Sequence, residues 1–396
     1  MPQTVKIING RLITPFRVIP QGSALIRDGR IIAVGEGTIP DHADTIIDAG
    51  GNYVAPGFID LHIHGGGGHD FMDGTVRAFH GITETHARYG TTAMVPTTLT
   101  AEKAHLLHTL DIYKEAVSQP HNGAGFLGMH LEGPYFAMNQ RGAQDPRYIR
   151  HPDPAEYREI LDYSDHISRW SVAPELPGAL EMGEYLRGKG ILPAMAHTDA
   201  IYEEVVKAVE CGYTLATHFY SAMSGVTRRN LHRYAGVIES VYLIDEIDAE
   251  VIADGVHLPA SLLQLIYKIK GPDRIALITD AMRGAGMPPG KSVLGPLNGG
   301  LEVIVEDGVA KLPDGSAFAG SVATTDRLVR NMVNLAGVPV ATAVRMMSYT
   351  PARIMGVAHR KGSLVAGKDA DVVVFDDDIT VQLTMVAGKV VHRIGE

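Results

Sequence analysis

The chain of 396 residues contains little cysteine and no excess of positive charge. Cys211 is its only cysteine, so no disulfide bond can form within the chain. The formal net charge of −10 gives no general attraction for nucleic acid or anionic lipid. We therefore expect no nucleic-acid partner, although a local basic loop could still hold a phosphate.

Long hydrophobic runs are also absent. Glycine or charged residues interrupt every apolar stretch before it reaches the roughly 20 residues that are needed to cross a bilayer. The first residues, Met1 to Lys6, lack the charged and then apolar pattern of a secretory signal peptide. We expect a cytoplasmic protein with no membrane partner.

What is present is an ordinary globular composition, with 45% hydrophobic and 20% charged residues. The chain is too long for a single small domain, but it suits one large barrel with a smaller module attached. No internal repeat or low-complexity tract suggests another architecture.

The two ends of the chain have the pattern of short β-strands. Near the N-terminus, apolar stretches alternate with Asn9-Gly10 and Asp28-Gly29, which are typical of β-hairpin turns. Apolar stretches separated by turn residues also occur near the C-terminus. Neither end alone has enough strands to bury a face, so we expect both ends to pack together as one small β-sandwich, comprising residues 1–54 and 359–396.

The middle of the chain, residues 55–358, alternates short apolar strands with amphipathic helices, which indicates parallel β/α units. Eight strands can be placed; they end near His64, Pro96, Glu132, Pro174, His197, His218, Asp254 and Asp280. Since eight such strands close a barrel, the sequence predicts an α/β fold with a (β/α)8 TIM barrel. Glycine-rich β signals predict a hairpin insertion near residues 292–318, before the last barrel helix.

A pair of histidines marks the end of the first predicted barrel strand. His62 and His64 flank Ile63, and in an extended strand residues i and i+2 point to the same side. Glycines 65–68 follow and leave room for a ligand. The histidine pair alone does not establish a ligand site, because one of the histidines could be a hydrogen-bonded core residue.

Four further candidate ligands each end a predicted strand: Glu132, His197, His218 and Asp280. The strand ends of a barrel meet on one face. Imidazole nitrogens and carboxylate oxygens suit zinc or ferrous iron, and such a cation lowers the pKa of water toward neutrality. Leaving so many groups unpaired in a core would be costly. The sequence therefore predicts a metal site made by His62, His64, Glu132, His197, His218 and Asp280. His130 and Asp60 share the strand faces of Glu132 and His62, where they either support the site or pack in the core.

Motifs spread over nearly the whole chain carry a family resemblance. They are Ala55–His64, His130–Tyr135, Ala196–Asp199, Thr217–Met223, Ile252–His257, Thr279–Met282, Ala319–Ser321 and Gly367–Asp371. Together they resemble the N-acetylglucosamine-6-phosphate deacetylases, a branch of the amidohydrolase superfamily. The resemblance implies a barrel with a β-sandwich made by both termini. It also implies hydrolysis of the acetamide of N-acetylglucosamine 6-phosphate to glucosamine 6-phosphate and acetate.

The resemblance further implies roles for the site residues. Glu132, His197 and His218 would hold the principal metal, with zinc the first choice and iron the alternative. Asp280 would act as the general base and then protonate the departing amine. His257 would lie near the carbonyl or a sugar hydroxyl and help to stabilise the oxyanion.

Because some relatives lack the histidine pair of the first strand and use one metal, its retention here suggests a second ion. His62 and His64 would bind it, and Glu132 or Asp280 would be shared. The expected content is thus one or two ions per subunit.

On the substrate side, the resemblance places the sugar phosphate at the backbone of Ser221 and Ala222 and at Arg229 from the neighbouring subunit of a homodimer. A solvated charged turn is the alternative interpretation of the Arg229 loop. Gln144 would contact the sugar, at a position where relatives commonly have histidine. Ser221 also replaces a usual asparagine, and the loop 229–234 replaces a shorter turn. Two alternatives therefore stay open: deacetylation of a different N-acetyl amino sugar or its phosphate, and a non-catalytic binding protein of this fold.

Overall fold

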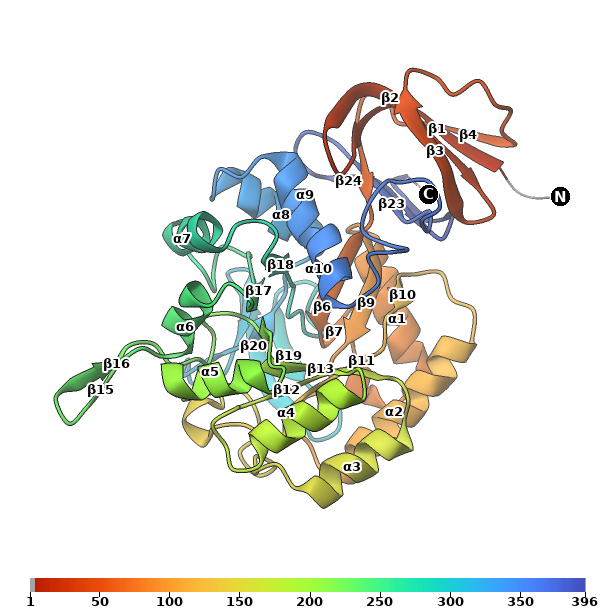
Figure 1. The fold of residues 1–396 in the computed structure, drawn as a ribbon. Coiled ribbons are helices and arrows are strands. Elements are labelled where there is room, and N and C mark those ends of the chain that lie inside the picture. Colours follow the sequence, from red (N-terminus) through yellow and green to blue (C-terminus); the bar gives the residue numbers. More distant parts are fainter. Residues whose placement is uncertain (1–3, 396) are drawn as a thin grey trace.

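The computed structural model describes residues 4–395, and of Arg229 it describes the backbone alone. Strands from both ends of the chain form one eight-stranded sheet, seen at the upper right of Figure 1. They are β1 (Thr4–Ile13), β2 (Val18–Arg27), β3 (Arg30–Glu36), β4 (Thr45–Asp48), β5 (Tyr53–Pro56), β23 (Val372–Phe375), β24 (Val381–Val386) and β25 (Lys389–Arg393). The strand order is β25-β24-β23-β5-β1-β2-β3, with β4 beside β1. The antiparallel pairing of β5 with β23 joins the two ends of the chain.

The two predicted hairpin turns have different outcomes. Asp28-Gly29 forms a two-residue turn, as predicted, because Arg27 at the end of β2 pairs with Arg30 at the start of β3. The prediction for Asn9-Gly10 is wrong: both residues lie inside β1, where the register with β2 shifts as in a β-bulge. A Cβ on Gly10 would lie 2.4 Å from a side-chain carbon of Val54. Glycine is therefore needed here for close strand packing, and it does not reverse the chain.

All eight strands predicted for the middle of the chain are present. They are β6 (Phe58–Ile63), β9 (Thr91–Pro96), β11 (Met129–Glu132), β12 (Ile167–Val172), β13 (Leu192–Met195), β14 (Leu215–Ala216), β17 (Asp248–Val251) and β18 (Ile275–Leu277). Within the described residues they form two parallel sheets, whereas one closed barrel was predicted. One sheet has the order β10-β9-β6, in which β10 is Gly125–Phe126, and the other has the order β11-β12-β13-β14-β17-β18. Two isolated parallel bridges link the sheets: Thr97, just after β9, pairs with His130 of β11, and Ile63 of β6 pairs with Ala281, which follows β18.

Helices follow the parallel strands and cover the outside of the sheets (Figure 1). They are η1 (Phe71–Asp73), α1 (Val76–Ala87), α2 (Lys103–Ser118), η2 (Met138–Gln140), α3 (Pro154–Tyr163), α4 (Ala179–Gly188), α5 (Tyr202–Glu210), α6 (Val237–Leu243), α7 (Ala260–Lys270), α8 (Thr325–Asn334), α9 (Val340–Met347) and α10 (Tyr349–Ile354). Polar caps fix several starts: the Thr75 hydroxyl accepts from the Ala78 N–H before α1, and the Asp153 carboxylate accepts from the Ala155 N–H of α3. These two caps fix where α1 and α3 begin.

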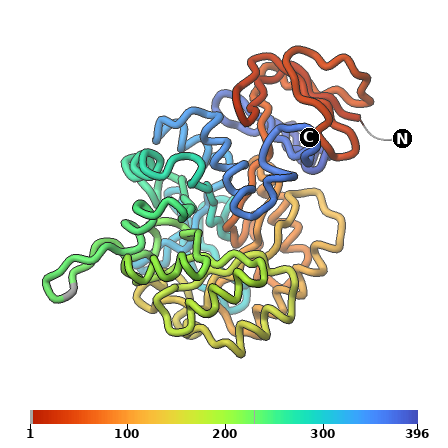
Figure 2. Tube along the Cα trace, in the orientation of Figure 1, coloured from red at the N-terminus to blue at the C-terminus, as the bar shows by residue number. Residues whose placement is uncertain are grey.

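Two antiparallel elements interrupt the β/α pattern. Between β18 and α8 lies a four-stranded sheet of β19 (Gly290–Leu294), β20 (Leu301–Glu306), β21 (Val309–Lys311) and β22 (Phe318–Ser321). The hairpin of β15 (Thr227–Arg229) and β16 (His232–Tyr234) projects away from the body of the molecule (Figures 1 and 2). At its tip, Leu231 is 84% exposed. A short pair, β7 (Gly65–Gly66) with β8 (His69–Asp70), follows β6.

Among the described residues, no helix is long and apolar enough to span a bilayer.

Candidate metal centre and active site

Six side chains meet where the parallel strands end. His62 lies in β6 and His64 follows it, while Glu132 is the last residue of β11. His197, His218 and Asp280 come just after β13, β14 and β18. Because parallel strands present their carboxyl ends on the same side, residues far apart in the sequence are brought together. All six are buried, each with at most 8% of its surface exposed.

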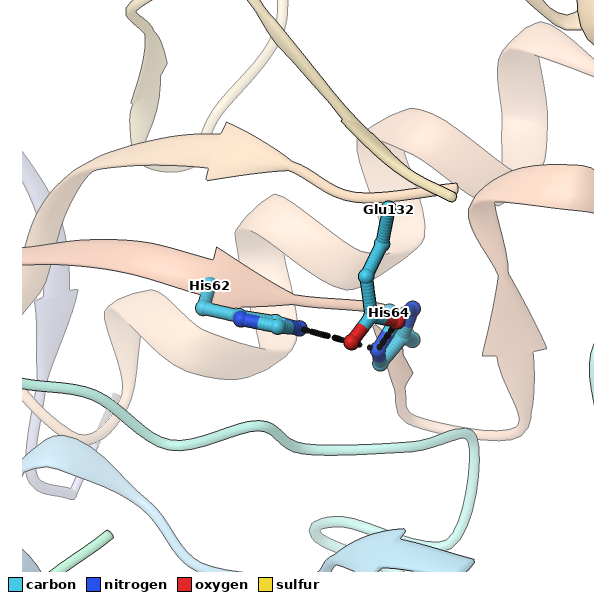
Figure 3. A group of neighbouring side chains, drawn as sticks. All are labelled: His62, His64 and Glu132. Carbon is cyan, nitrogen blue, oxygen red and sulfur yellow. Dashed lines mark hydrogen bonds and ion pairs between the residues drawn. The ribbon is translucent and has the colours of Figure 1, made fainter. Parts of the chain in front are cut away.

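Two groups of potential metal ligands share one carboxylate. In the first, His62, His64 and Glu132 offer atoms within 4.8 Å of one another (Figure 3). The second contains Glu132, His197 and His218, in which the glutamate Oε1 lies 3.2 Å from Nε2 of His197 and 3.0 Å from Nε2 of His218. Glu132 therefore stands between two histidine pairs.

Hydrogen bonds at the far side of the rings orient three of the histidines. Nδ1 of His197 lies 2.7 Å from the Gln140 carbonyl oxygen, Nδ1 of His218 lies 3.2 Å from that of Ser221, and Nδ1 of His64 lies 3.2 Å from that of Thr97. A carbonyl oxygen only accepts, so in each pair Nδ1–H donates. In the neutral ring the Nε2 lone pair then faces the cluster, which is the arrangement a metal-ligating histidine requires.

The backbone at three site residues adopts left-handed conformations, which are uncommon for residues other than glycine. The φ angles are 47° at His197, 34° at His218 and 49° at Asp280. Such positions cost of order 1–3 kcal/mol each and persist where the surroundings enforce them. Here they turn the side chains inward just after the strands end.

Asp280 lies against the first histidine pair. Its Oδ1 is 3.2 Å from Nε2 of His64 and 3.4 Å from Nε2 of His62. Burial alone raises the pKa of Asp280, but the nearby imidazoles, His62 first, outweigh burial and lower this pKa below its usual value. For Glu132, burial is likewise outweighed by His62 and by hydrogen bonds from His197 and His218, so its pKa is well below the usual range. Both carboxylates are therefore ionised and able to bind a cation.

The cluster forms the floor of a cavity of about 470 Å³. His64, Glu132, His197, His218 and Asp280 line this cavity, together with His257. Nδ1 of His257 lies 2.8 Å from Oδ2 of Asp254, whose other oxygen accepts the N–H groups of Val256 and His257 itself. Asp254 thus fixes the orientation of the His257 ring toward the cavity.

Three of the predicted substrate-binding residues, Ser221, Ala222 and Gln144, also line the cavity. The Gln144 amide is already engaged, because its Nε2 donates to Glu132 Oε2 at 2.7 Å and its Oε1 accepts the Thr100 N–H at 2.8 Å. Arg229 lies in the projecting hairpin, and its side chain is outside the described residues.

A buried polar network beneath the site was missed by the sequence analysis. Glu250 in β17 and Arg169 in β12 form a fully buried ion pair, and Oε2 of Glu250 lies 3.7 Å from Nδ1 of His62. Burial raises the pKa of Glu250, but Arg169 and His62 together, Arg169 first, outweigh burial and hold this pKa at about 2. A charged residue inside an apolar strand was the available signal, since such a residue must find a partner.

The sequence left open whether His130 and Asp60 support the site or pack in the core. Both make buried hydrogen bonds near the site. His130 lies 2.7 Å from Ser171 through Nε2 and 3.2 Å from Thr97 through Nδ1. The Asp60 carboxylate accepts the Thr279 hydroxyl at 2.5 Å. Both side chains therefore support the strand ends that carry the cluster.

Parallel strands with outer helices, and histidines and carboxylates gathered at the strand ends, define a metal-dependent hydrolase of the α/β class. The model of the amidohydrolase family matches residues 53–391. The chain belongs to the amidohydrolase family and is a metal-dependent hydrolase that acts on carbon–nitrogen bonds.

The chain is also similar over nearly its whole length to characterised deacetylases. It is 34% identical to N-acetylglucosamine-6-phosphate deacetylase of Lysinibacillus sphaericus, with 92% of each chain covered. It is 33% identical to N-acetylgalactosamine-6-phosphate deacetylase of Escherichia coli O157:H7, with 96% of this chain and 97% of the relative covered. Among solved structures, a mutant N-acetyl-D-glucosamine-6-phosphate deacetylase from Mycobacterium smegmatis, in complex with N-acetyl-D-glucosamine-6-phosphate, has a TM-score of 0.88 at 32% identity. The match covers 98% of this chain and 99% of that one.

Proposed function

We propose that this chain hydrolyses the acetamide of N-acetylglucosamine 6-phosphate and releases glucosamine 6-phosphate and acetate. One observation carries the proposal: the shared carboxylate of Glu132 lies between His197 and His218 at the floor of a cavity that Asp280 also lines. The similarity to deacetylases of phosphorylated amino sugars, which extends over more than nine-tenths of the chain, supports this choice of substrate.

The donor set fits a divalent cation. Glu132, His197 and His218 would hold the principal ion, and His62 and His64 would hold a second one with Glu132 or Asp280 shared. Nitrogen and oxygen donors suit zinc first and iron as the alternative, with one or two ions per subunit. When bound, the ion polarises the acetamide carbonyl and lowers the pKa of water.

Asp280 is the general base of the proposed reaction. Its ionised carboxylate takes a proton from the water that attacks the acetyl carbon. When the carbon–nitrogen bond breaks, Asp280 gives that proton to the departing amine nitrogen. Its burial beside the histidine pair restricts the carboxylate to one face of the cavity.

His257 assists from another side of the cavity. Nδ1–H of His257 is donated to Asp254, so Nε2 is the ring nitrogen available to the cavity. With a proton on Nε2 the ring can donate to the carbonyl oxygen as negative charge develops, and without that proton Nε2 can accept from a sugar hydroxyl.

For the phosphate, we propose the backbone around Ser221 and Ala222 together with Arg229 from the partner in a homodimer. The hairpin that carries Arg229 extends away from its own subunit (Figure 2), which suits contact with a second copy. A guanidinium matches the geometry of phosphate oxygens. Gln144, whose second amide hydrogen is not needed by Glu132, would contact the sugar.

A second candidate substrate is the galactosamine epimer. Ser221 and Gln144 stand at substrate-side positions where the resembling family commonly has other residues, and a similarly related protein is an N-acetylgalactosamine-6-phosphate deacetylase. Polar contacts of this kind decide between substrates that differ by a hydroxyl position.

The remaining proposals concern architecture and location. We infer that the two parallel sheets are arcs of one (β/α)8 barrel at 55–358, since single bridges connect β9 with β11 and β6 with the segment after β18. The terminal sheet would be a β-sandwich domain of 1–54 and 359–396, and the four-stranded sheet an insertion near 292–318. We infer a cytoplasmic location, because the proposed substrate is phosphorylated and does not cross a bilayer unaided.

Acetate release across a small substrate panel, combined with elemental analysis of the purified protein, tests the proposal. The panel contains the 6-phosphates of N-acetylglucosamine and N-acetylgalactosamine and both unphosphorylated sugars. We expect the highest kcat/KM with N-acetylglucosamine 6-phosphate. A preference for the galactosamine epimer would support the second candidate, and no acetate from any substrate in metal-replete protein would contradict both.

A further inference from the structure

Gln144 holds one oxygen of Glu132, the residue that the two candidate ligand groups share. Gln144 is 6% exposed, and its Nε2 lies 2.7 Å from Glu132 Oε2. The direction of this hydrogen bond is fixed by the Thr100 N–H, which can only donate and lies 2.8 Å from Gln144 Oε1. The amide nitrogen must therefore face the carboxylate.

With this contact in place, the two oxygens of the Glu132 carboxylate face different groups. Oε1 faces His197, His218 and, at 3.6 Å, Nε2 of His62. Oε2 faces Gln144 and, at 3.4 Å, Nε2 of His64. Without the Gln144 hydrogen bond, the carboxylate could rotate and exchange its oxygens between the two groups.

We propose that Gln144 is a positioning residue that fixes the Glu132 carboxylate and thereby sets the affinity of the His197–His218 group for its ion. This inference rests on the proposed function. It gives Gln144 a role in the metal centre that is separate from any contact with the sugar. Residues that orient a metal ligand typically change metal affinity by about 10- to 100-fold when replaced.

Another glutamine provides a matched control. Gln119, just after α2, donates its side-chain amide to the Glu115 carboxylate at 3.0 Å, and both residues are exposed. Gln119→Leu thus removes a hydrogen bond of the same kind without removing a contact to Glu132. Gln144→Leu removes the contact, and Gln144→His restores a ring N–H that can donate to the carboxylate.

The experiment measures zinc affinity of metal-free protein by chelator competition, together with the absorption spectrum of the cobalt-substituted protein and kcat and KM for acetate release. We expect Gln144→Leu to weaken zinc binding about 10- to 100-fold and to change the cobalt spectrum. Gln119→Leu should match the unaltered protein, and Gln144→His should recover most of the affinity. If Gln144→Leu is too unstable to measure, Gln144→Met, which keeps the length of the side chain but lacks the amide, takes its place.

Three results would overturn the inference: unchanged affinity and spectrum in Gln144→Leu, equal weakening in Gln119→Leu, or no recovery in Gln144→His. A loss confined to KM would also overturn it, since that would assign Gln144 to the sugar alone. If the unaltered protein binds no divalent ion and releases no acetate, the proposed function itself fails, and this result is distinct from the others.

Discussion

The carboxylate of Glu132 lies 3.0 Å from the imidazole Nε2 of His218, although 86 positions separate these residues in the sequence. The contact exists because each residue stands at the end of a parallel strand, and the strands end on the same side. The chemistry of the site therefore depends on the register of the parallel strands as much as on the identity of its residues.

Replacing the proposed base should abolish most of the turnover and leave the principal ion at Glu132, His197 and His218 in place. Asp280→Asn keeps the shape of the side chain but cannot take a proton, so we expect kcat to fall by about 10²- to 10⁴-fold. Steady-state acetate release and elemental analysis provide the measurement. Asp245→Asn, at an exposed position, is the control. Undiminished turnover in Asp280→Asn would show that the base has been misassigned.

Removing the first-strand histidines should affect one metal and spare the other. The double variant His62→Ala with His64→Ala leaves Glu132, His197 and His218 intact. We expect two ions per chain in the unaltered protein and one in this variant, as measured by elemental analysis after dialysis. Loss of all metal from the variant would mean that the two ligand groups do not act separately.

Replacing Asp254 should lower kcat through its effect on His257. In Asp254→Asn the ring loses its charged partner at Nδ1, so we expect kcat to fall about tenfold, a loss of roughly 1.4 kcal/mol in transition-state stabilisation. KM should change little. His257→Ala gives the reference, and a combined variant no slower than His257→Ala would place both residues in one unit. Additive losses would argue against coupling.

Breaking the buried Arg169–Glu250 ion pair should lower the free energy of unfolding. Arg169→Met leaves the Glu250 carboxylate uncompensated in the interior, and we expect the free energy of unfolding to drop by about 3–5 kcal/mol. The double variant Arg169→Met with Glu250→Leu removes both charges and should recover a large part of the loss. Urea unfolding of metal-free protein measures both. An equal or greater loss in the double variant would contradict this account.

Arg229 should affect binding of the phosphate. A hydrogen bond to a charged group contributes about 1.5–3 kcal/mol, so Arg229→Ala should raise KM for the phosphorylated substrate about tenfold or more. KM for the unphosphorylated sugar should stay the same. Arg228→Ala, at an exposed position on the same hairpin, is the control. Sedimentation should give a dimer for all three proteins, and a monomer for the unaltered protein would exclude supply of Arg229 by a partner.

The sequence predicted the positions of the strands that carry the site better than it predicted how these strands pair with one another. Strand ends near His62, Glu132 and Asp280 could be read from apolar runs, and the family motifs named the same residues. The hydrogen-bonded order of the strands could not be read in this way, because it depends on pairing between distant segments. The strands therefore appear in two sheets where one closed barrel was predicted.

The misinterpreted Asn9-Gly10 has a similar cause. A turn-forming pair and a bulge inside a strand have the same local sequence, and the neighbouring strand that carries Val54 decides between them. The engagement of Gln144 by Glu132 was also not accessible, since the motif gives the position of Gln144 but not the direction of its amide.

The pairing of β5 with β23 has a consequence for biosynthesis. The edge of β5 gains its antiparallel partner only when the ribosome has made nearly the entire chain, because β23 belongs to the other end of the sequence. Until then the nascent protein exposes an unpaired strand edge, which is a template for wrong association. The terminal sheet is therefore completed after most of the chain has been translated, and a polypeptide that stops before β23 lacks the strand that covers this edge.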